Sequence, residues 1–414
     1  MIANGSHHRV TACRICGSDD LDVFLDLGTT PLANAFVAPE RITEPEPRFP
    51  LEVMRCLVCG LAQLSVVVAP EVMFQNYLYA SSASAPMLAH FDALAEDLVA
   101  RFAPRDSLVV EIGSNDGVLL RPLKERGVRA LGIEPASNIA RLANEAGLET
   151  WNAFFSYDAA AEVREERGRA RVVVANNVVA HIDALAEVAR AIEHLLDNDG
   201  VFVAEVPYLA DLLDHVEYDT VYHEHLSYFH LAPLQRLFAD VGMELFDVRR
   251  LEIHGGSVRV FAGRRGRHPR TRQLEELVTS EARLARDDIF RGFAKRVDDS
   301  RGALRTMLDR LGKEGRSIAA LGATAKGNTL LNYCGIGPQT IAFIADSTPL
   351  KQGLLTPGTH IPVRAEHALD DERPNCALLL AWNYADAIMR RHAEYISSGG
   401  RFIHPIPLAR LLPP

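Results

Sequence analysis

The sequence predicts an α/β protein in three parts, a small cysteine-bearing N-terminal segment followed by two Rossmann-like units. Residues 1–70 are predicted to be loop-rich, because prolines recur at positions 31, 39, 45, 47 and 50. In residues 71–265 and again in residues 313–414, short apolar runs alternate with segments of helical periodicity. Such alternation is typical of parallel sheets with right-handed crossovers. Residues 266–312 are predicted to form a helical connector, broken near Gly292.

The composition is that of an ordinary globular protein, with 414 residues, 48% of them hydrophobic and 24% charged. No window approaches the roughly 18 uninterrupted apolar residues of a transmembrane helix. Met1–Val10 lacks the apolar run of a signal peptide. We therefore expect a cytoplasmic monomer with no membrane partner. The net charge of −10 argues against a nucleic-acid partner, because phosphate binding needs a basic face.

Two CxxC pairs, each followed by glycine, lie in the N-terminal segment, at Cys13/Cys16 and at Cys56/Cys59. Two intervening residues allow both sulfurs of a pair to turn onto one ion, and the glycine permits the tight backbone turn. Four thiolates make a closed tetrahedral zinc site, which is structural rather than catalytic. The alternative, two redox pairs or incidental pairs, is less favoured, because disulfides are rare in the cytosol. The sequence thus predicts a zinc-binding domain stabilised by its metal.

Buried parallel strands are predicted wherever a short apolar run is bounded by turn residues. In the first unit these are Ser107–Ile112, Ala130–Ile133, Arg171–Ala175 and Val201–Val206. In the second unit they are Ser317–Leu321, Ile341–Ala345, Ala377–Ala381 and Arg401–Ile403. Glu252–Arg264 alternates and contains two adjacent glycines, which indicates a bent antiparallel strand at the end of the first unit.

A glycine loop follows the first predicted strand. It reads acid-x-Gly-x-x-x-Gly from Glu111 through Gly113 to Gly117, the usual first motif of Rossmann-like methyltransferases. The glycines let the backbone approach the methionine part of the cofactor. A dinucleotide is disfavoured, because GxGxxG is absent and Asp116 would repel a diphosphate from the helix start. The sequence therefore predicts a class I methyltransferase domain that binds S-adenosylmethionine.

Polar and aromatic residues at the ends of the next strands extend this predicted cofactor site. Glu134 can accept hydrogen bonds from both ribose hydroxyls, and an aromatic segment from Trp151 to Phe155 can flank the adenine. Asn176 and Asn177 end the third strand at the carboxyl edge, where ligands of such folds bind. The predicted cofactor-binding residues are Glu111, Gly113, Asn115, Asp116, Gly117, Glu134, Pro135, Phe154, Asn176 and Asn177.

The densest cluster of titratable and aromatic residues is the segment 218–229, which contains Tyr222-His223-Glu224-His225. A neutral histidine can accept a proton, a neighbouring carboxylate can orient it, and a tyrosine can donate to a developing enolate oxygen. A metal is disfavoured, because no HExxH motif or third ligand is evident. The plain alternative is a packed aromatic turn. His181 is expected beside the transferred methyl group, or in a core or helix-start role.

The chain resembles the sugar C-methyltransferases of deoxysugar biosynthesis, which modify thymidine diphosphate (TDP)-linked 4-keto sugars at C3. The resemblance covers nearly the whole chain, and its HEHL and GxxAKGN blocks are specific in this order. The matching blocks are the paired CxxC motifs, Tyr77-Leu78-Tyr79, Glu111 to Gly117, Asn176-Asn177-Val178 with His181, Tyr222 to Leu226, Gly322 to Asn328 and Thr356 to Thr359.

The resemblance implies a mechanism and the residues that carry it. The C4 ketone acidifies the C3 proton, and a base matched to His225 removes it with Glu224 alongside, so that the enolate attacks the cofactor methyl. Tyr222, His181 and Tyr79 are then expected near the reacting centre. The C-terminal unit is expected to help hold the nucleotide. The substrate-binding residues implied are Tyr77, Lys326, Asn328 and Lys351.

The sequence leaves two other functional hypotheses open. One is a methyltransferase that acts on oxygen or nitrogen of another small molecule, which needs no base for a C–H bond. The other is a zinc-scaffolded protein that binds a nucleotide sugar without catalysis. The favoured substrate is a TDP-linked keto-deoxysugar of antibiotic or surface-glycan biosynthesis.

Overall fold

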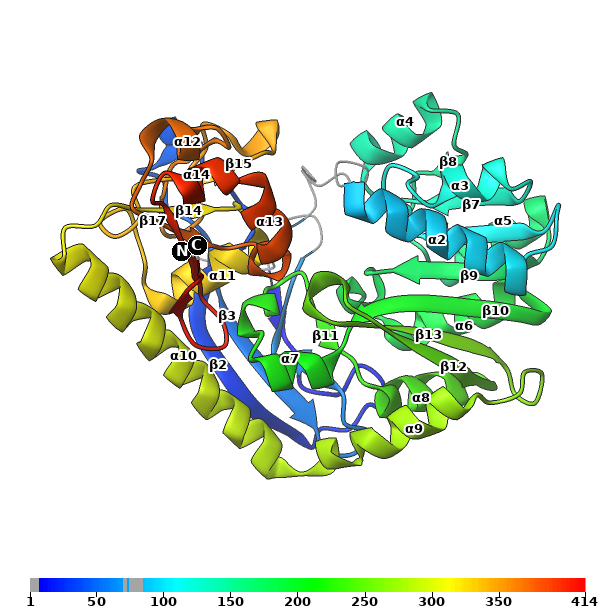
Figure 1. Ribbon diagram of the computed structural model, residues 1–414. Coiled ribbons are helices and arrows are strands. Elements are labelled where there is room, and N and C mark those ends of the chain that lie inside the picture. Colours follow the sequence, from blue (N-terminus) through cyan, green and yellow to red (C-terminus); the bar gives the residue numbers. More distant parts are fainter. Residues whose placement is uncertain (1–6, 70–72, 74–84, 414) are drawn as a thin grey trace.

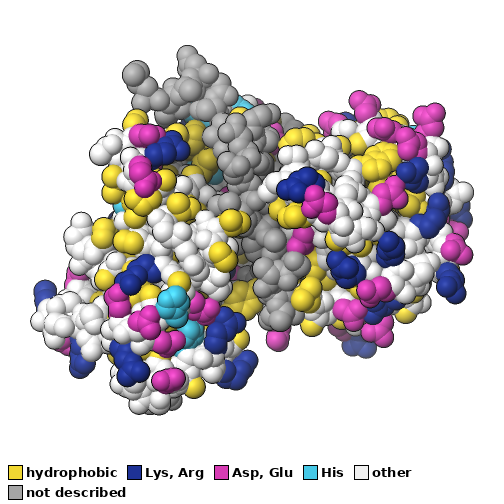
Figure 2. All heavy atoms as spheres, turned by 90° about the horizontal axis from the view of Figure 1, so that it is seen from above, with side chains coloured by type: hydrophobic (Ala, Val, Ile, Leu, Met, Phe, Trp, Pro, Cys, Tyr) yellow, Lys and Arg dark blue, Asp and Glu magenta, His cyan; other side chains and the backbone are white. Residues whose placement is uncertain are grey.

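The computed structural model describes residues 7–69, 73 and 85–413. Figure 1 shows one α/β lobe on the left and one on the right, with the β2 and β3 ribbons and the long helix α10 below the left lobe. On the face seen in Figure 2, acidic and basic side chains are interspersed over both lobes. No helix of the described part is both long and apolar enough to span a membrane.

The N-terminal domain is more regular than its prolines suggest. Its four-stranded antiparallel sheet has the order β11-β4-β3-β2, and a separate ladder pairs β1 with β5. The bounds are β1 His7–Arg9, β2 Leu21–Pro31, β3 Arg48–Cys56, β4 Ala62–Leu64, β5 Val66–Val68 and β11 Ser227–Tyr228, with a short 3-10 helix η1 at Pro39–Arg41. The expectation of a loop-rich segment was wrong, because β2 and β3 bury apolar side chains that include Leu25 and Val53.

The edge strand of this sheet comes from a distant part of the chain. Strand β11 follows the HEHL block directly and pairs with β4, with Ser227 opposite Gln63. The segment 218–229, which was predicted to carry the acid–base residues, therefore contributes a strand to the sheet of the zinc-binding domain.

The central domain has a seven-stranded sheet of order β12-β13-β10-β9-β6-β7-β8. Strands β6 to β10 are parallel, and β12 and β13 are antiparallel. The strands are β6 Leu108–Ile112, β7 Arg129–Ile133, β8 Thr150–Trp151, β9 Ala170–Asn176, β10 Leu196–Pro207, β12 Met243–Leu251 and β13 Ser257–Arg264. The helices are α2 Ala85–Arg101, α3 Leu120–Glu125, α4 Ser137–Glu145, α5 Tyr157–Arg167, α6 Leu185–Leu195, α7 Leu209–His215 and α8 Leu231–Ala239, with η3 Val179–His181, η4 Tyr218–Thr220 and η5 Ile253–Gly255.

Helices cover both faces of this sheet, which is why its parallel strands read as continuous apolar runs. Val109 packs with α2 residues such as Leu94, whereas Val110 packs in the core that holds Val163 of α5 and Ile192 of α6. The strand order reverses between β6 and β9, which places the ligand crevice of such a fold between their carboxyl ends.

The connector consists of α9 (Arg272–Glu281), η6 (Ala282–Ala285) and α10 (Asp287–Lys313). Helix α10 continues through Gly292, so the predicted break there was wrong. The break lies at Arg286, where the backbone is extended with ψ 133°. Helix α10 buries a stripe of residues that includes Phe290. The ring of Phe290 packs edge-on against Phe24 of the N-terminal sheet, with ring centroids 4.9 Å apart, and this packing stabilises the helix.

The C-terminal domain is a second Rossmann-like unit. Its six-stranded sheet has the order β16-β15-β14-β17-β18-β19, parallel except for β19. The strands are β14 Ile318–Leu321, β15 Ile344–Asp346, β16 Val363–Ala365, β17 Cys376–Leu379, β18 Arg401–His404 and β19 Arg410–Leu411. The helices are α11 Ala325–Cys334, α12 Ala368–Glu372, α13 Ala385–Arg391 and α14 Ala393–Ser397, with η7 Pro349–Lys351 and η8 Trp382–Tyr384. The predicted α/β fold class is confirmed.

Candidate active site and zinc centre

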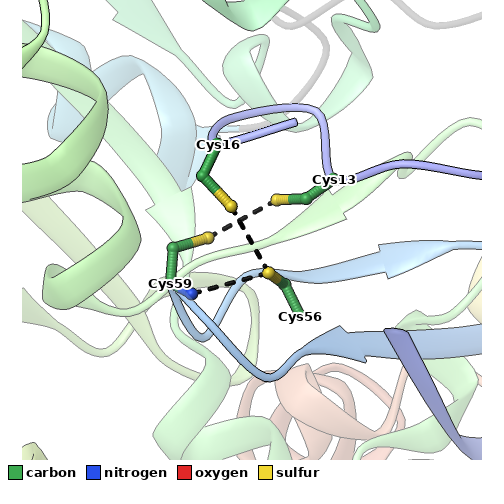
Figure 3. Close-up of side chains that lie close together, drawn as sticks. All are labelled: Cys13, Cys16, Cys56 and Cys59. Carbon is green, nitrogen blue, oxygen red and sulfur yellow. Dashed lines mark hydrogen bonds between the residues drawn. The ribbon is translucent and has the colours of Figure 1, made fainter. Parts of the chain in front are cut away.

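The four N-terminal cysteines converge, as Figure 3 shows. The Sγ atoms of Cys13 and Cys59 lie 3.4 Å apart, those of Cys16 and Cys56 lie 3.5 Å apart, and all four fall within 4.8 Å of one another. A tetrahedral zinc ion with Zn–S bonds of about 2.3 Å needs sulfurs about 3.8 Å apart, so the cluster fits zinc. Four protein ligands complete the coordination, which makes the site structural.

The glycine after each CxxC pair performs the role that its position predicts. Gly17 and Gly60 have φ values of +70° and +84°. Their N–H groups donate to the carbonyls of Cys13 and Cys56 at 2.9 and 3.0 Å, which closes two equivalent turns around the metal position. Within the described residues, this cluster is the only group of three or more potential ligands that could hold a metal ion.

The glycine loop after β6 lies at the point where the strand order reverses. Gly113 has φ +65°, and a Cβ there would meet Val178 Cγ2 at 2.8 Å. Around this loop, Glu111 Oε2, Ser114 Oγ and Asn176 Oδ1 are buried without a hydrogen-bond partner in the described chain. Buried polar atoms without a partner suit a polar ligand such as the methionine part of S-adenosylmethionine.

Glu134 holds the loop to the end of β7. Its Oε2 accepts a hydrogen bond from the Asn115 N–H, and its Oε1 accepts one from the Ala136 N–H, both at 2.9 Å. Burial raises the pKa of Glu134, and these two bonds oppose that effect. Pro135 follows directly, and Phe154 is 62% exposed, so its ring is available to a planar group.

Glu111 and Asn176, both predicted to bind the cofactor, contact each other at this sheet edge. Asn176 Nδ2 donates to Glu111 Oε1 at 3.3 Å, and burial holds the pKa of Glu111 well above its usual range. The next residue, Asn177, has φ +54° and turns the chain at the carboxyl edge of β9. The structure therefore brings the predicted cofactor residues of β6, β7 and β9 to one sheet edge.

His225 lies in the loop between η4 and β11, and both of its ring nitrogens form hydrogen bonds. Its Nδ1 donates to the carbonyl of Thr220 at 3.0 Å, which leaves the Nε2 lone pair to the Tyr222 hydroxyl at 2.8 Å. The ring of His181 meets the His225 ring edge-on, with centroids 5.0 Å apart. Burial lowers the pKa of His181 to about 4, so this ring is neutral at pH 7.

Glu224 does not orient His225 as the sequence suggested. Its Oε1 accepts a 2.6 Å hydrogen bond from Asn34 Nδ2 of the N-terminal domain, whereas the Thr220 carbonyl fixes the His225 ring. Burial raises the pKa of Glu224 to about 7 against the opposing effects of Asn34 and Lys351. Lys351 belongs to the C-terminal domain, where its Nζ donates to the Ala323 carbonyl at 2.8 Å. Glu224 of the central domain is therefore influenced by Asn34 of the N-terminal domain and by Lys351 of the C-terminal domain.

His223 faces away from this group. Its Nε2 bonds the Pro50 carbonyl at 3.2 Å, and its ring packs edge-on against Phe49 with centroids 5.8 Å apart. The two histidines of the HxH pattern thus have separate partners.

Lys326 has carboxylate neighbours where the sequence suggested phosphate. Its Nζ lies 3.7 Å from Glu217 Oε2, 3.9 Å from Asp219 Oδ1 and 4.4 Å from the centre of the Trp382 ring. Trp382 Nε1 donates to Asp219 Oδ2 at 2.6 Å, which completes the group. We call these four residues the Lys326 cluster. It joins the start of α11 and η8 to the segment that carries His225.

Asn328 also has a partner within the chain, because its Nδ2 donates to the Ala33 carbonyl at 2.7 Å. Tyr77 and Tyr79 lie outside the described residues. Sequence reasoning missed Asn34, Thr220 and Trp382. Asn34 and Trp382 come from other domains, and no local pattern in the sequence places them beside the HEHL block.

Comparison with known proteins decides the family. Residues 13–74 match a family described as "putative zinc binding domain", residues 87–248 match a methyltransferase domain, and residues 252–407 match a C-methyltransferase C-terminal domain. The C-methyltransferase NovU of Streptomyces niveus is 38% identical over 408 residues, which covers 97% of each chain. The chain belongs to the C-methyltransferase family.

Because the chain belongs to this family, it is an enzyme, and its methyl acceptor is a carbon atom rather than oxygen or nitrogen. Its cofactors are S-adenosylmethionine and the zinc ion of the four-cysteine cluster. Among solved structures, magnesium protoporphyrin IX methyltransferase of Synechocystis PCC 6803 is 15% identical, with a TM-score of 0.33 over 43% of this chain and 79% of that one. The CcbJ methyltransferase of Streptomyces caelestis is 15% identical, with a TM-score of 0.34 over 47% and 95%. Likenesses this weak carry no inference.

Proposed function

We propose that the enzyme methylates C3 of a TDP-linked 4-keto-deoxysugar, in the biosynthesis of an antibiotic or surface-glycan sugar. The observation that supports this most is the hydrogen bonding of His225, whose Nδ1–H is committed to a backbone carbonyl. That bond selects the tautomer with a basic Nε2, which a base for a C–H bond requires. Methyl transfer to oxygen or nitrogen would need no such base.

In the proposed reaction, the C4 ketone acidifies the C3 proton and His225 Nε2 accepts it. The C3–H bond breaks, its electron pair moves into a C3–C4 double bond, and the C4 oxygen becomes an enolate. The Tyr222 hydroxyl, which donates to Nε2 in the resting enzyme, then turns to the enolate oxygen. S-adenosylmethionine, when bound, supplies the methyl group that C3 takes up, and the Nε2 proton is afterwards released to solvent.

His181 and Glu224 are given supporting parts in this proposal. Because His181 is neutral, its ring can border His225 without opposing the positive charge that develops there. Glu224, with its pKa raised to about 7, can hold or release a proton near neutral pH. Tyr79 and Tyr77, which lie outside the described residues, stay predicted near the sugar from the sequence alone.

We propose that the cofactor binds at the carboxyl edge of the central sheet and that the nucleotide binds at the carboxyl edge of the C-terminal sheet. Glu134 accepts from the ribose hydroxyls, the loop from Gly113 to Gly117 borders the methionine part, and Phe154 flanks the adenine. Lys351 is proposed as the cation for the diphosphate. The proposed division is 1–70 for zinc, 71–265 for methyl transfer, 266–312 as connector and 313–414 for the nucleotide sugar, in a cytoplasmic monomer without nucleic-acid or membrane partners.

The direct test is product analysis with a labelled methyl group. The enzyme is incubated with S-adenosylmethionine carrying a ¹³C methyl and with a series of TDP-4-keto-deoxysugars, and the products are examined by NMR. The expected product carries the label bonded to C3. A label on oxygen or nitrogen, or the absence of any sugar product across the series, would contradict the proposal.

Two histidine variants make this test specific. His225→Gln should bind S-adenosylmethionine as the wild type does and form no product. His223→Gln is the matched control, because His223 is a buried histidine two positions away whose partners lie in the N-terminal domain. It should retain most of the activity.

A further inference from the structure

Arg14 lies inside the first CxxC pair, between two proposed zinc ligands, and its side chain extends toward the active site. The side chain is only 3% exposed. Its backbone N–H donates to Gln63 Oε1 at 3.0 Å, and Gln63 Nε2 donates back to the Ala12 carbonyl at 3.2 Å. The position of Arg14 is therefore fixed by the turn around the metal and by β4.

The guanidinium of Arg14 contacts both segments that carry the proposed catalytic histidines. Its Nη1 donates to the carbonyl of Leu226, the residue after His225, at 3.2 Å. Its Nε donates at 2.7 Å to Asp183 Oδ1, two residues beyond His181. A third bond, from Nη1 to the Leu64 carbonyl at 3.2 Å, ties the same group to β4.

These contacts differ from those of an ordinary ion pair. Asp183 is half-exposed, so the pair by itself gives Arg14 little reason to be buried. The planar guanidinium of arginine holds its donors in fixed, divergent directions, a geometry that the compact ammonium of lysine does not reproduce. Here one direction leads to the His225 segment and the other to the His181 segment.

We propose that Arg14 is a positioning residue for methyl transfer, through which the zinc centre sets the relative placement of His181 and His225. The zinc site then has a role in catalysis without touching the substrate. This inference rests on the proposed function of the two histidines. A misplacement of about 1 Å in a reacting group can cost about a hundredfold in rate, so even a small shift of one segment should be measurable.

The test compares Arg14→Met with Arg55→Met. Arg55 is a second buried arginine of the N-terminal domain, and its guanidinium pairs with Asp287 and stacks on Phe290, neither of which belongs to a histidine segment. Each variant is assayed for zinc content, for affinity for S-adenosylmethionine, for kcat and KM with the TDP-4-keto-sugar, and for amide hydrogen exchange of residues 178–183 and 222–228.

Arg14→Met should retain zinc and cofactor affinity, lose at least about tenfold in kcat at unchanged KM, and exchange faster in both segments. Arg55→Met should keep its kcat and its exchange there. Equal kcat values for Arg14→Met and the wild type, or an equal loss in both variants, would overturn the proposal.

A milder variant covers the case in which Arg14→Met does not fold. Asp183→Asn changes a half-exposed side chain and should lower kcat severalfold while it loosens residues 178–183. Wild-type kcat and wild-type exchange in this variant would overturn the proposal as well. If the wild type itself transfers no methyl to C3, the proposed function fails, whereas the exchange measurement still decides whether Arg14 holds the two segments.

Discussion

The glycine loop after β6 and the glycine loop after β14 are built alike. In the first, Glu134 at the end of β7 accepts hydrogen bonds from the Asn115 and Ala136 N–H groups. In the second, Asp346 at the end of β15 accepts from the Ala323 N–H at 2.6 Å and from the Thr348 N–H at 2.7 Å. Each acid ties a glycine loop to the neighbouring strand, at the point where the strand order of its sheet reverses.

The two loops differ in what faces them. Both retain buried polar atoms without a hydrogen-bond partner in the described chain, Glu111 Oε2 and Asn176 Oδ1 at the first loop and Lys326 Nζ and Asp219 Oδ1 at the second. At the second, the methyltransferase domain itself supplies Glu217 and Asp219 to Lys326. We therefore expect the same local arrangement to serve a cofactor in one domain and a domain junction in the other. A glycine loop at a switch point shows where a ligand can bind, but its surroundings decide whether one does.

The largest expected effect comes from removing the cation of the second loop. Lys326→Met removes the cation that lies beside two buried carboxylates, so the free energy of unfolding should fall by about 3 kcal/mol near pH 8. Lys326→Arg should recover most of it. Denaturant titration measures both. Lys295→Met is the control, because its pair with Asp299 is exposed and should contribute less than about 1 kcal/mol.

The same variant distinguishes a structural role of Lys326, as the partner of buried carboxylates, from a role in binding the substrate. If the lysine binds the diphosphate of the substrate, as the sequence suggested, Lys326→Met should raise KM strongly and leave the stability unchanged. That result would break the comparison between the loops, because both would then serve ligands.

A smaller effect is expected from neutralising the acid of each loop. Glu134→Gln removes the charge of the acceptor proposed for the ribose hydroxyls, so the affinity for S-adenosylmethionine should fall about tenfold or more. Asp346→Asn is the matched change in the second unit and should leave that affinity as it is. Calorimetry gives both values. Equal losses in the two variants would mean that the acids act on the fold rather than on the cofactor.

The smallest effect concerns pH. Burial raises the pKa of Glu217 to about 7, although Lys326 opposes the shift. The folded state therefore binds a proton more tightly than the unfolded state, and the stability from this group is present at low pH and lost as the pH rises toward 7. Glu217→Gln should flatten that decline by roughly 1 kcal/mol or more. An unchanged pH profile of stability would place the titration elsewhere.

Much of the fold could be predicted because its signals are local. The CxxC spacing, the buried strands and the loop from Glu111 to Gly117 each depend on residues that are neighbours in the sequence. What could not be predicted depends on contacts between domains. Glu224 is bound by Asn34, and Lys326 is bound by Glu217 and Asp219, across sequence separations that no periodicity encodes. The long β2 and β3 strands were missed because prolines near their ends suggested loops.

Proton exchange at C3 tests the central claim most directly, because it reports the base without the methyl transfer. The enzyme is incubated in deuterium oxide with the TDP-4-keto-sugar and S-adenosylhomocysteine, the demethylated cofactor product. A positioned base typically contributes about 100- to 10,000-fold. The wild type should therefore introduce deuterium at C3 without net methylation, and His225→Gln should lose this exchange while it still binds both ligands. Wild-type exchange in His225→Gln would contradict the assignment of the base.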